Sequence, residues 1–160
     1  TSPRANRKRP PFSSSPAREQ GYREIMAEAG LAVRSADVCH GPHVRTVARE
    51  LADRLLCSPD RPTAVFAASD TQALGVLEAA RTAGLDVPGD LSVVGFDDVE
   101  VSGYAGLTTV RQPLFESGQV AARMLLDAVD AERPPDAKVR KLTLELVERS
   151  TTAPPKRGKE

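Results

Sequence analysis

Polar residues follow three apolar runs of the sequence, and they are the first candidates for chemistry. These are His40-Gly41-Pro42-His43 after Leu31–Cys39, Ser69-Asp70 after Thr63–Ala68, and Asp97-Asp98 after Leu91–Phe96. In an open parallel sheet, ligands bind beyond the carboxyl ends of the strands, because loops and helix N-termini converge there. A carboxylate at such a point, beside an arginine, can bind vicinal hydroxyls. This chemistry suits a sugar or a nucleoside.

Each of these groups also has a structural interpretation. Ser69 and Gln72 form an S-x-x-Q capping box, which favours a helix cap over a ligand contact. Asp97 and Asp98 are compatible with either a ligand contact or the end of a strand. His40 and His43 have HxxH spacing without a third ligand nearby, which is a weak metal signal, and we expect no metal or cofactor. Cys39 and Cys57 lack CxxC spacing and are expected to be buried thiols.

The sequence contains none of the common enzyme motifs. There is no GxGxxG, no P-loop and no G-x-S-x-G nucleophile elbow. With no candidate nucleophile, we expect a binding protein and not an enzyme.

Composition indicates one soluble globular domain. The chain has 160 residues, 40% hydrophobic and 28% charged, and its 22 basic and 22 acidic residues cancel. A zero net charge does not favour binding of a nucleic-acid backbone by the chain itself. No apolar run is long enough to span a membrane, and the first residues lack the apolar core of a secretion signal. We expect a cytoplasmic protein.

Helices and strands are expected to alternate along the chain. Four helices are expected. The first begins at Ser15 and ends at Gly30, and the second carries the apolar stripe Val44, Val47, Ala48, Leu51 and Leu55. The third begins at Ser69 and ends at Gly84, and the fourth covers Leu114–Ala131. The expected strands are Leu31–Cys39, Thr63–Ala68, Leu91–Phe96, Leu107–Val110 and Lys141–Val147. This order predicts an α/β fold with a parallel sheet and helices on both faces. Residues 1–16 are expected to form a flexible basic arm, residues 17–151 the domain, and residues 152–160 a tail.

Four segments of the sequence carry a resemblance to a known family. They are Pro62–Gly75, Leu91–Asp98, Leu107–Pro113 and Glu145–Thr151. In order and spacing, from about Ala17 to Thr151, they resemble the lactose/galactose repressor (LacI/GalR) family. The resemblance implies a bacterial transcriptional regulator whose effector-binding region is like a periplasmic sugar-binding protein.

The resemblance also implies an effector site made of four residues. Arg18, in Arg18-Glu19-Gln20-Gly21-Tyr22, matches the family's effector-binding arginine, and Asp97 matches its effector-binding aspartate. Ser69 stands where many members have a ligand-contacting asparagine. His43 falls where the family has an aromatic ring that stacks on the effector.

The same resemblance implies partners and an incomplete domain. Family members bind operator DNA through a helix-turn-helix that this sequence does not contain, so we expect a truncated repressor that is a homodimer when intact and has no membrane partner. We expect residues 17–151 to be the C-terminal effector-binding subdomain. Its helix at 114–131 would pack on the absent N-terminal subdomain. A transporter's sugar-binding protein and a small α/β enzyme are the alternative interpretations.

Overall fold

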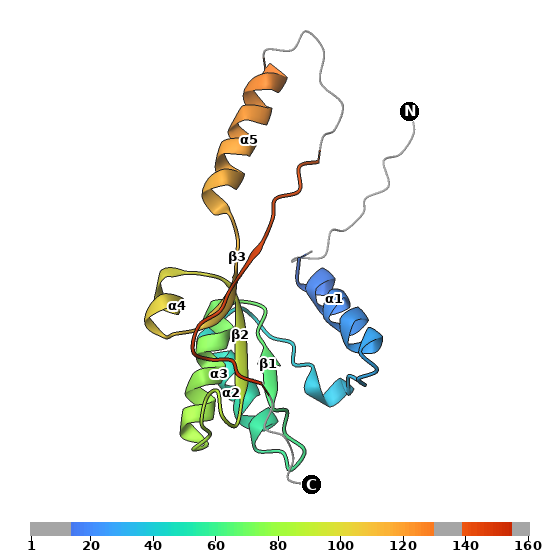
Figure 1. Cartoon of the computed structure of the whole chain (residues 1–160), viewed down its shortest axis with the longest axis vertical. Coiled ribbons are helices and arrows are strands. Elements are labelled where there is room, and N and C mark those ends of the chain that lie inside the picture. The colour runs from blue at the N-terminus through green and yellow to red at the C-terminus, as the bar shows by residue number, and fades with distance from the viewer. Residues whose placement is uncertain (1–13, 130–138, 155–160) are drawn as a thin grey trace. The chain divides into compact units, whose positions relative to one another are not determined.

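The computed structural model describes residues 14–129 and 139–154, which divide into two units, residues 1–42 and residues 43–160. Unit 1 contains α1 (Ser14–Glu28) and the short helix η1 (Ser35–Asp37). Unit 2 contains, in order, α2 (Arg45–Leu56), β1 (Ala64–Phe66), α3 (Asp70–Thr82), β2 (Ser92–Asp97), α4 (Glu100–Tyr104), β3 (Thr108–Arg111), α5 (Leu114–Val129) and β4 (Glu145–Val147) (Figure 1). No helix within the described ranges is long and apolar enough to cross a membrane.

The four strands form one sheet in the order β1-β2-β3-β4. β1, β2 and β3 run parallel, with Phe66 opposite Val94 and Asp97 opposite Arg111. β4 runs antiparallel to β3. The mostly parallel sheet with packed helices confirms the predicted α/β class, and the antiparallel β4 differs from the all-parallel sheet expected. The parallel strands bring the ends of β1, β2 and β3 to one edge.

A small aliphatic core holds the sheet and two helices together. α2 packs on α3, and α3 packs on β2. A Cβ at Gly75 would collide with the backbone of Arg45 and Arg49, so glycine at this position allows α2 and α3 to approach closely. The buried members of the core are Ala52, Leu56, Ala67, Ala73, Val76, Ala79, Ala80, Leu91, Val93 and Leu107.

Two predicted helix ends are confirmed by the same hydrogen-bond pattern. Gly30 and Gly84 both have a φ of +71°, which glycine adopts without steric cost. After α3, Leu85 donates its amide to the carbonyl of Ala80 at 2.9 Å and Gly84 to that of Arg81 at 3.2 Å. This is the Schellman arrangement, which satisfies carbonyls that would otherwise lack partners.

The predicted strand at Leu31–Cys39 is wrong. Within unit 1 no described residue belongs to a strand, and residues 35–37 form η1 instead. Arg34 donates two hydrogen bonds to the Asp37 carboxylate, each at 2.8 Å, across this turn. A strand needs a partner for its backbone groups, and the local ion pair fits the turn.

Both cysteines are exposed, so the prediction of buried thiols is wrong. Cys57 is the C-cap of α2, one residue past the buried Leu56. Cys39 lies in the segment that was expected to be a strand and has no sheet to cover it.

Ordered structure also extends beyond both predicted bounds of the domain, residues 17 and 151. Residues 14–16 belong to α1 and not to the predicted arm, whose residues 1–13 lie outside the described residues. Thr152 and Ala153 contact the sheet, since Thr152 bonds to Thr108 at 3.0 Å and Ala153 to Ser92 at 3.2 Å. They are therefore not part of a free tail, and residues 155–160 lie outside the described residues.

α5 differs from α2 and α3, the other two long helices of unit 2. It begins at Leu114 as predicted, and none of its sixteen residues is buried. The predicted apolar stripe of Val120, Ala121, Met124, Leu125 and Ala128 is half-buried or exposed along its whole length, with Leu125 at 65% exposure.

Candidate functional site

Two adjacent aspartates with unusual backbone geometry lie at the carboxyl end of β2. Asp97 has a φ of +120° and Asp98 a φ of +55°, a region that residues with a side chain rarely adopt. Such a conformation persists only when the surrounding contacts fix it, and it is concentrated at functional sites. The turn Asp97-Asp98 is therefore the best candidate for a site at this edge of the sheet.

Asp97 is half-buried and is held by one neighbour. The Nε2 of Gln112, directly after β3, donates to Oδ1 of Asp97 at 2.6 Å. A carboxylate has about four acceptor positions. Within the described residues no side chain donates to Oδ2, which leaves Asp97 with the capacity to bind hydroxyl groups of a ligand.

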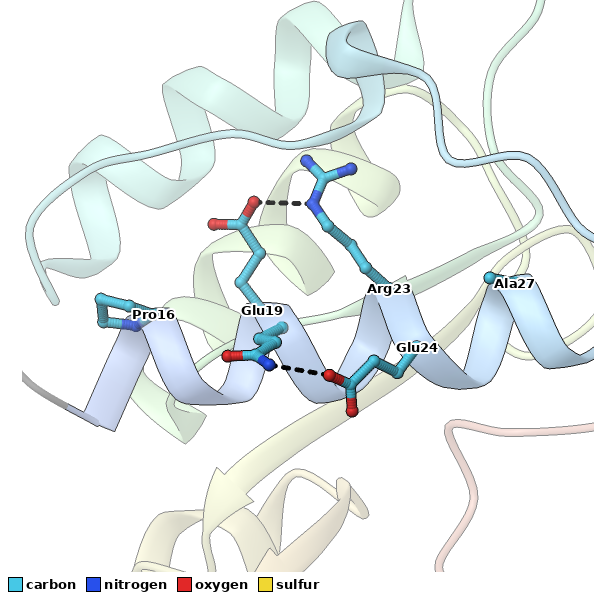
Figure 2. A pocket seen from close by; sticks show the side chains of 6 residues that line it. Pro16, Glu19, Arg23, Glu24 and Ala27 are labelled. Carbon is cyan, nitrogen blue, oxygen red and sulfur yellow. Dashed lines mark hydrogen bonds and ion pairs between the residues drawn. The ribbon is translucent and has the colours of Figure 1, made fainter.

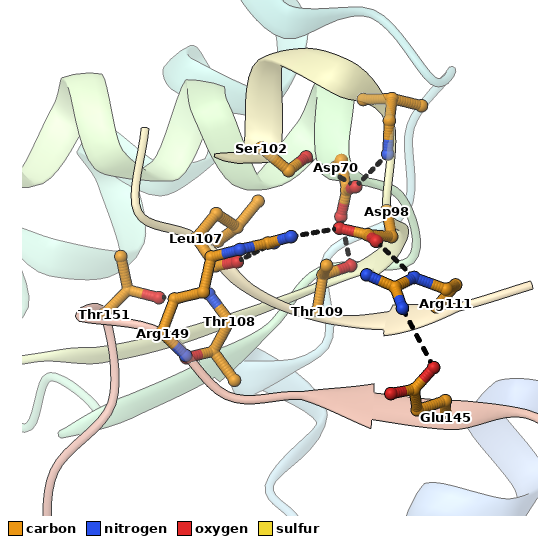
Figure 3. Close-up of polar contacts among 11 residues, drawn as sticks. Asp70, Asp98, Ser102, Leu107, Thr108, Thr109, Arg111, Glu145, Arg149 and Thr151 are labelled. Atoms are coloured by element: carbon orange, nitrogen blue, oxygen red, sulfur yellow. Dashed lines mark hydrogen bonds and ion pairs between the residues drawn. The ribbon is translucent and has the colours of Figure 1, made fainter. Parts of the chain in front are cut away.

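Asp98 is paired with two arginines. Its carboxylate accepts from Nε of Arg111 and from Nη2 of Arg149, each at 2.6 Å, and its side chain is 8% exposed (Figure 3). Burial raises the pKa of Asp98, but the hydrogen bonds and charges of Arg149 and Arg111 outweigh it and hold that pKa below 3.8. The ion pair with Asp98 in turn raises the pKa of Arg111. Both oxygens of Asp98 are engaged in ion pairs within the protein, which favours a structural role for this carboxylate.

The same cluster ties the end of the chain to the sheet. Arg111 also pairs with Glu145 of β4 at 3.0 Å, and Arg149 donates to the carbonyl of Leu107 at 2.7 Å. Segments separated by about fifty residues in sequence thus meet at the carboxylate of Asp98 (Figure 3).

Ser69 is the N-cap of α3, as predicted. Its side chain accepts from the amide of Gln72 at 3.3 Å, and the residue is buried. Phe66 lies opposite Val94 in neighbouring parallel strands. Ser69 follows Phe66 by the same number of residues as Asp97 follows Val94. Ser69 and Asp97 therefore lie at the same edge of the sheet.

The other two predicted site residues do not come from the strands of the sheet. His43 is exposed and directly precedes Val44, the N-cap of α2. Arg18 lies half-buried on α1 in the other unit.

Unit 1 has a shallow depression along α1 (Figure 2). It is lined by Pro16, Glu19, Gln20, Arg23, Glu24 and Ala27. Glu19 pairs with Arg23 and Gln20 donates to Glu24, so its polar groups bond along the helix. It is an exposed helix face and not a formed site.

Sequence reasoning missed two residues near the Asp97-Asp98 turn, Gln112, which contacts Asp97, and Arg149, which contacts Asp98. Asp70, one of the candidate polar residues of the sequence, is a fully buried acceptor of hydrogen bonds. The pair Gln112-Pro113 after a predicted strand was the available signal for the first. Arg149 had no local signal, since its partner is remote in sequence. Among the described residues, no three potential metal-ligating side chains come together.

Known proteins resemble this chain over most of its length. The family model described as "Periplasmic binding protein-like domain" matches residues 6–152. Catabolite control protein A of Priestia megaterium is 36% identical over 115 residues, 71% of this chain and 35% of that protein. The transcriptional repressor CytR of Escherichia coli K12 is 35% identical over 137 residues, 84% of this chain and 40% of that protein.

Solved structures agree with these relatives. A LacI family transcriptional regulator from Mycobacterium smegmatis has a TM-score of 0.77 and 39% identity, and covers 89% of this chain and 54% of its own. A LacI family regulatory protein from Chloroflexus aggregans has a TM-score of 0.78 and 36% identity. The match covers 85% of this chain and 50% of that protein's chain. The chain spans about two fifths of the curated relatives, which are named as regulators and not as enzymes. The chain belongs to the periplasmic binding protein-like family and corresponds to the effector-binding portion of LacI/GalR regulators.

Proposed function

We propose that the chain senses a small polyhydroxylated molecule, a sugar or a nucleoside, for a transcriptional repressor. The observation that carries this proposal is the Asp97 carboxylate, half-buried at the carboxyl end of β2 in a strained turn and held through Oδ1 alone by Gln112. A rigid carboxylate at this edge accepts hydrogen bonds from hydroxyls without first having to be ordered.

Arg18, His43 and Ser69 are the proposed further contacts. Arg18 would donate two parallel hydrogen bonds to ligand oxygens, which suits the same hydroxyl-rich class. His43 is exposed and could offer its ring face to the ligand. The hydroxyl of Ser69 already accepts the hydrogen bond that caps α3, so its contribution to ligand binding would be the weakest of the three.

In the whole regulator, effector binding would change the affinity for operator DNA. A ligand shifts a conformational equilibrium only by the difference in its affinity for the two states. The resemblance to repressors such as CytR supports operator DNA as a partner, a homodimer and a location in the cytoplasm as proposals for the intact protein.

A ligand screen tests this function. The chain is mixed with D-glucose, D-galactose, D-ribose, D-fructose, adenosine, cytidine and inosine, and its melting temperature is measured with each. Any binder is then titrated by calorimetry. We expect at least one sugar or nucleoside to stabilise the chain, because a ligand that binds only the folded state raises its stability. If none of these compounds stabilises or binds the chain, the result contradicts the proposal.

A further inference from the structure

Asp70 is a buried carboxylate that the proposed binding chemistry does not use. It is fully buried at the first position of α3. An isolated buried carboxylate is costly, so its contacts indicate what it is for. Its Oδ2 accepts from the amide of Val99 at 2.9 Å and from Oγ of Ser102 at 2.6 Å, and its Oδ1 accepts from Oγ1 of Thr109 (Figure 3).

Two of these donors come from the segment after the Asp97-Asp98 turn, and the third lies opposite Gly95, before the turn. Val99 directly follows the turn, Ser102 lies on α4 after it, and Thr109 lies on the neighbouring strand β3. The first residue of the turn, Asp97, is held from the other side by its pairing with Arg111 in the sheet. The two residues with positive φ are therefore fixed at both ends.

The space around Asp70 shows how closely this contact is fitted. A Cβ at Gly95, two residues before the turn on β2, would collide with the Asp70 carboxylate and contact Leu107. Glycine at this position lets the carboxylate lie against the strand and reach the amide beyond the turn. The contact between the Asp70 carboxylate and Gly95 therefore joins the N-terminus of α3 to β2.

We propose that Asp70 is a positioning residue for effector binding, which fixes the strained Asp97-Asp98 turn by accepting hydrogen bonds from Val99, Ser102 and Thr109. The inference rests on the proposed role of Asp97 in binding. Asp70 is too deeply buried to touch a ligand, so it acts only through the turn. Without it, the turn relaxes from positive φ and the Asp97 carboxylate loses its fixed direction.

Two substitutions test this inference. Asp70→Asn keeps the shape and one acceptor oxygen, and Thr109→Val removes one donor at nearly constant volume. The matched control is Thr151→Val, because Thr151 is also buried and its hydroxyl also bonds within the sheet, accepting from the amide of Thr108 at 2.9 Å and donating to the carbonyl of Val93 at 2.7 Å. Thr151 makes none of these bonds to Asp70 or to the turn.

The first measurement needs no ligand. Amide chemical shifts and the amide-to-Hα couplings that report φ are recorded by NMR for each variant. In Asp70→Asn and Thr109→Val, we expect the changes to concentrate at Asp97, Asp98 and Val99. In Thr151→Val, we expect them to concentrate at Val93 and Thr108. If Asp70→Asn and Thr109→Val both fold and the couplings of Asp97 and Asp98 are unchanged in both, the inference is overturned. If Asp70→Asn does not fold, the couplings of Thr109→Val decide.

The second measurement is the calorimetric affinity for the sugars and nucleosides of the screen. We expect Asp70→Asn and Thr109→Val to weaken binding by roughly three- to thirtyfold, as for other substitutions remote from a ligand. Thr151→Val should bind like the unmodified chain although it is less stable. Equal weakening in all three would overturn the positioning role. If the unmodified chain binds none of the compounds, the proposed function fails for this class, while the NMR couplings still decide whether Asp70 holds the turn.

Discussion

At the scale of single residues, three neighbouring carboxylates have three different roles set by their surroundings. Asp70 is buried among neutral donors, Asp98 is paired with Arg111 and Arg149, and Asp97 is half-buried with one partner, Gln112. Asp97 keeps the most acceptor positions of the three, since a carboxylate has about four. The family resemblance singled out Asp97, whereas residue type and position alone could not separate Asp97 from Asp98, because the arginines that engage Asp98 come from β3 and from beyond β4.

The ion pairs of Asp98 predict a dependence of stability on pH. A carboxyl whose pKa is lowered in the folded state stabilises that state above its unfolded pKa, and this contribution is lost as the pH falls through the folded pKa. The pKa of Asp98 is held below 3.8 in the folded protein by Arg149 and Arg111. We expect the difference in unfolding free energy between the unmodified chain and Asp98→Asn to be constant near neutral pH and to shrink as the pH falls below about 4.

Urea unfolding at several pH values measures this difference. Asp127→Asn is the control, since Asp127 is exposed on α5 and lies in no ion pair among the described residues. A difference for Asp98→Asn that grows toward low pH would contradict the assignment.

Arg18 carries a prediction of its own. Lysine keeps the positive charge but cannot reproduce the planar fork of guanidinium. If Arg18 donates two hydrogen bonds to an effector, Arg18→Lys should lose most of the binding to any sugar or nucleoside found in the screen, while the melting temperature of the free chain stays the same. Equal affinity of the lysine variant, measured by calorimetry, would show that Arg18 makes no such paired contact.

At the scale of elements, local signals predicted what local contacts determine. The cap at Ser69 and the stop at Gly84 are confirmed, because each depends on residues within a few positions. The strand predicted near Leu107 is also confirmed, and there the apolar pattern agrees with pairing to β2 and β4. The strand expected at Leu31–Cys39 is absent, and α4 was not anticipated. α4 depends on Asp70, which is about thirty residues away and binds Ser102, and periodicity does not report such a contact.

The close packing of α2 on α3 predicts opposite effects for two glycine substitutions. Gly75→Ala would place a Cβ against the backbone of Arg45 and Arg49, and overpacking of this kind costs about 1–3 kcal/mol. A Cβ added at Gly118 of α5 would meet open space, so Gly118→Ala should stabilise the helix by about 0.5–1 kcal/mol. Urea unfolding checks both values, and equal effects at the two positions would show that α2 and α3 are not in close contact.

At the scale of the whole molecule, the stability of unit 2 is unevenly distributed. α3 has six buried residues and packs on both α2 and β2, whereas α5 has none. An isolated helix of this length is marginal in water, since most helix stability in proteins comes from packing. Covering the apolar side chains of α5, such as Phe115, Leu125 and Leu126, would require a surface that the described residues do not supply.

Hydrogen exchange measures this difference directly. In a dilute sample of the chain, we expect amides from Gln119 to Ala128 to exchange far faster than those of α3. Faster exchange in α5 follows from local opening that does not require unfolding of the core. Protection of α5 equal to that of α3 in a confirmed monomer would show that the helix is covered within the chain.

The most direct test of effector binding by Asp97 is a calorimetric titration of three proteins with the best-binding sugar or nucleoside of the screen. They are the unmodified chain, Asp97→Asn, and Asp127→Asn as a control that removes the same charge from α5. We predict that Asp97→Asn binds more weakly by about 1.5–3 kcal/mol for each charge-assisted hydrogen bond lost, and that Asp127→Asn binds like the unmodified chain. Unchanged affinity in a folded Asp97→Asn variant would contradict the claim that this carboxylate binds the effector.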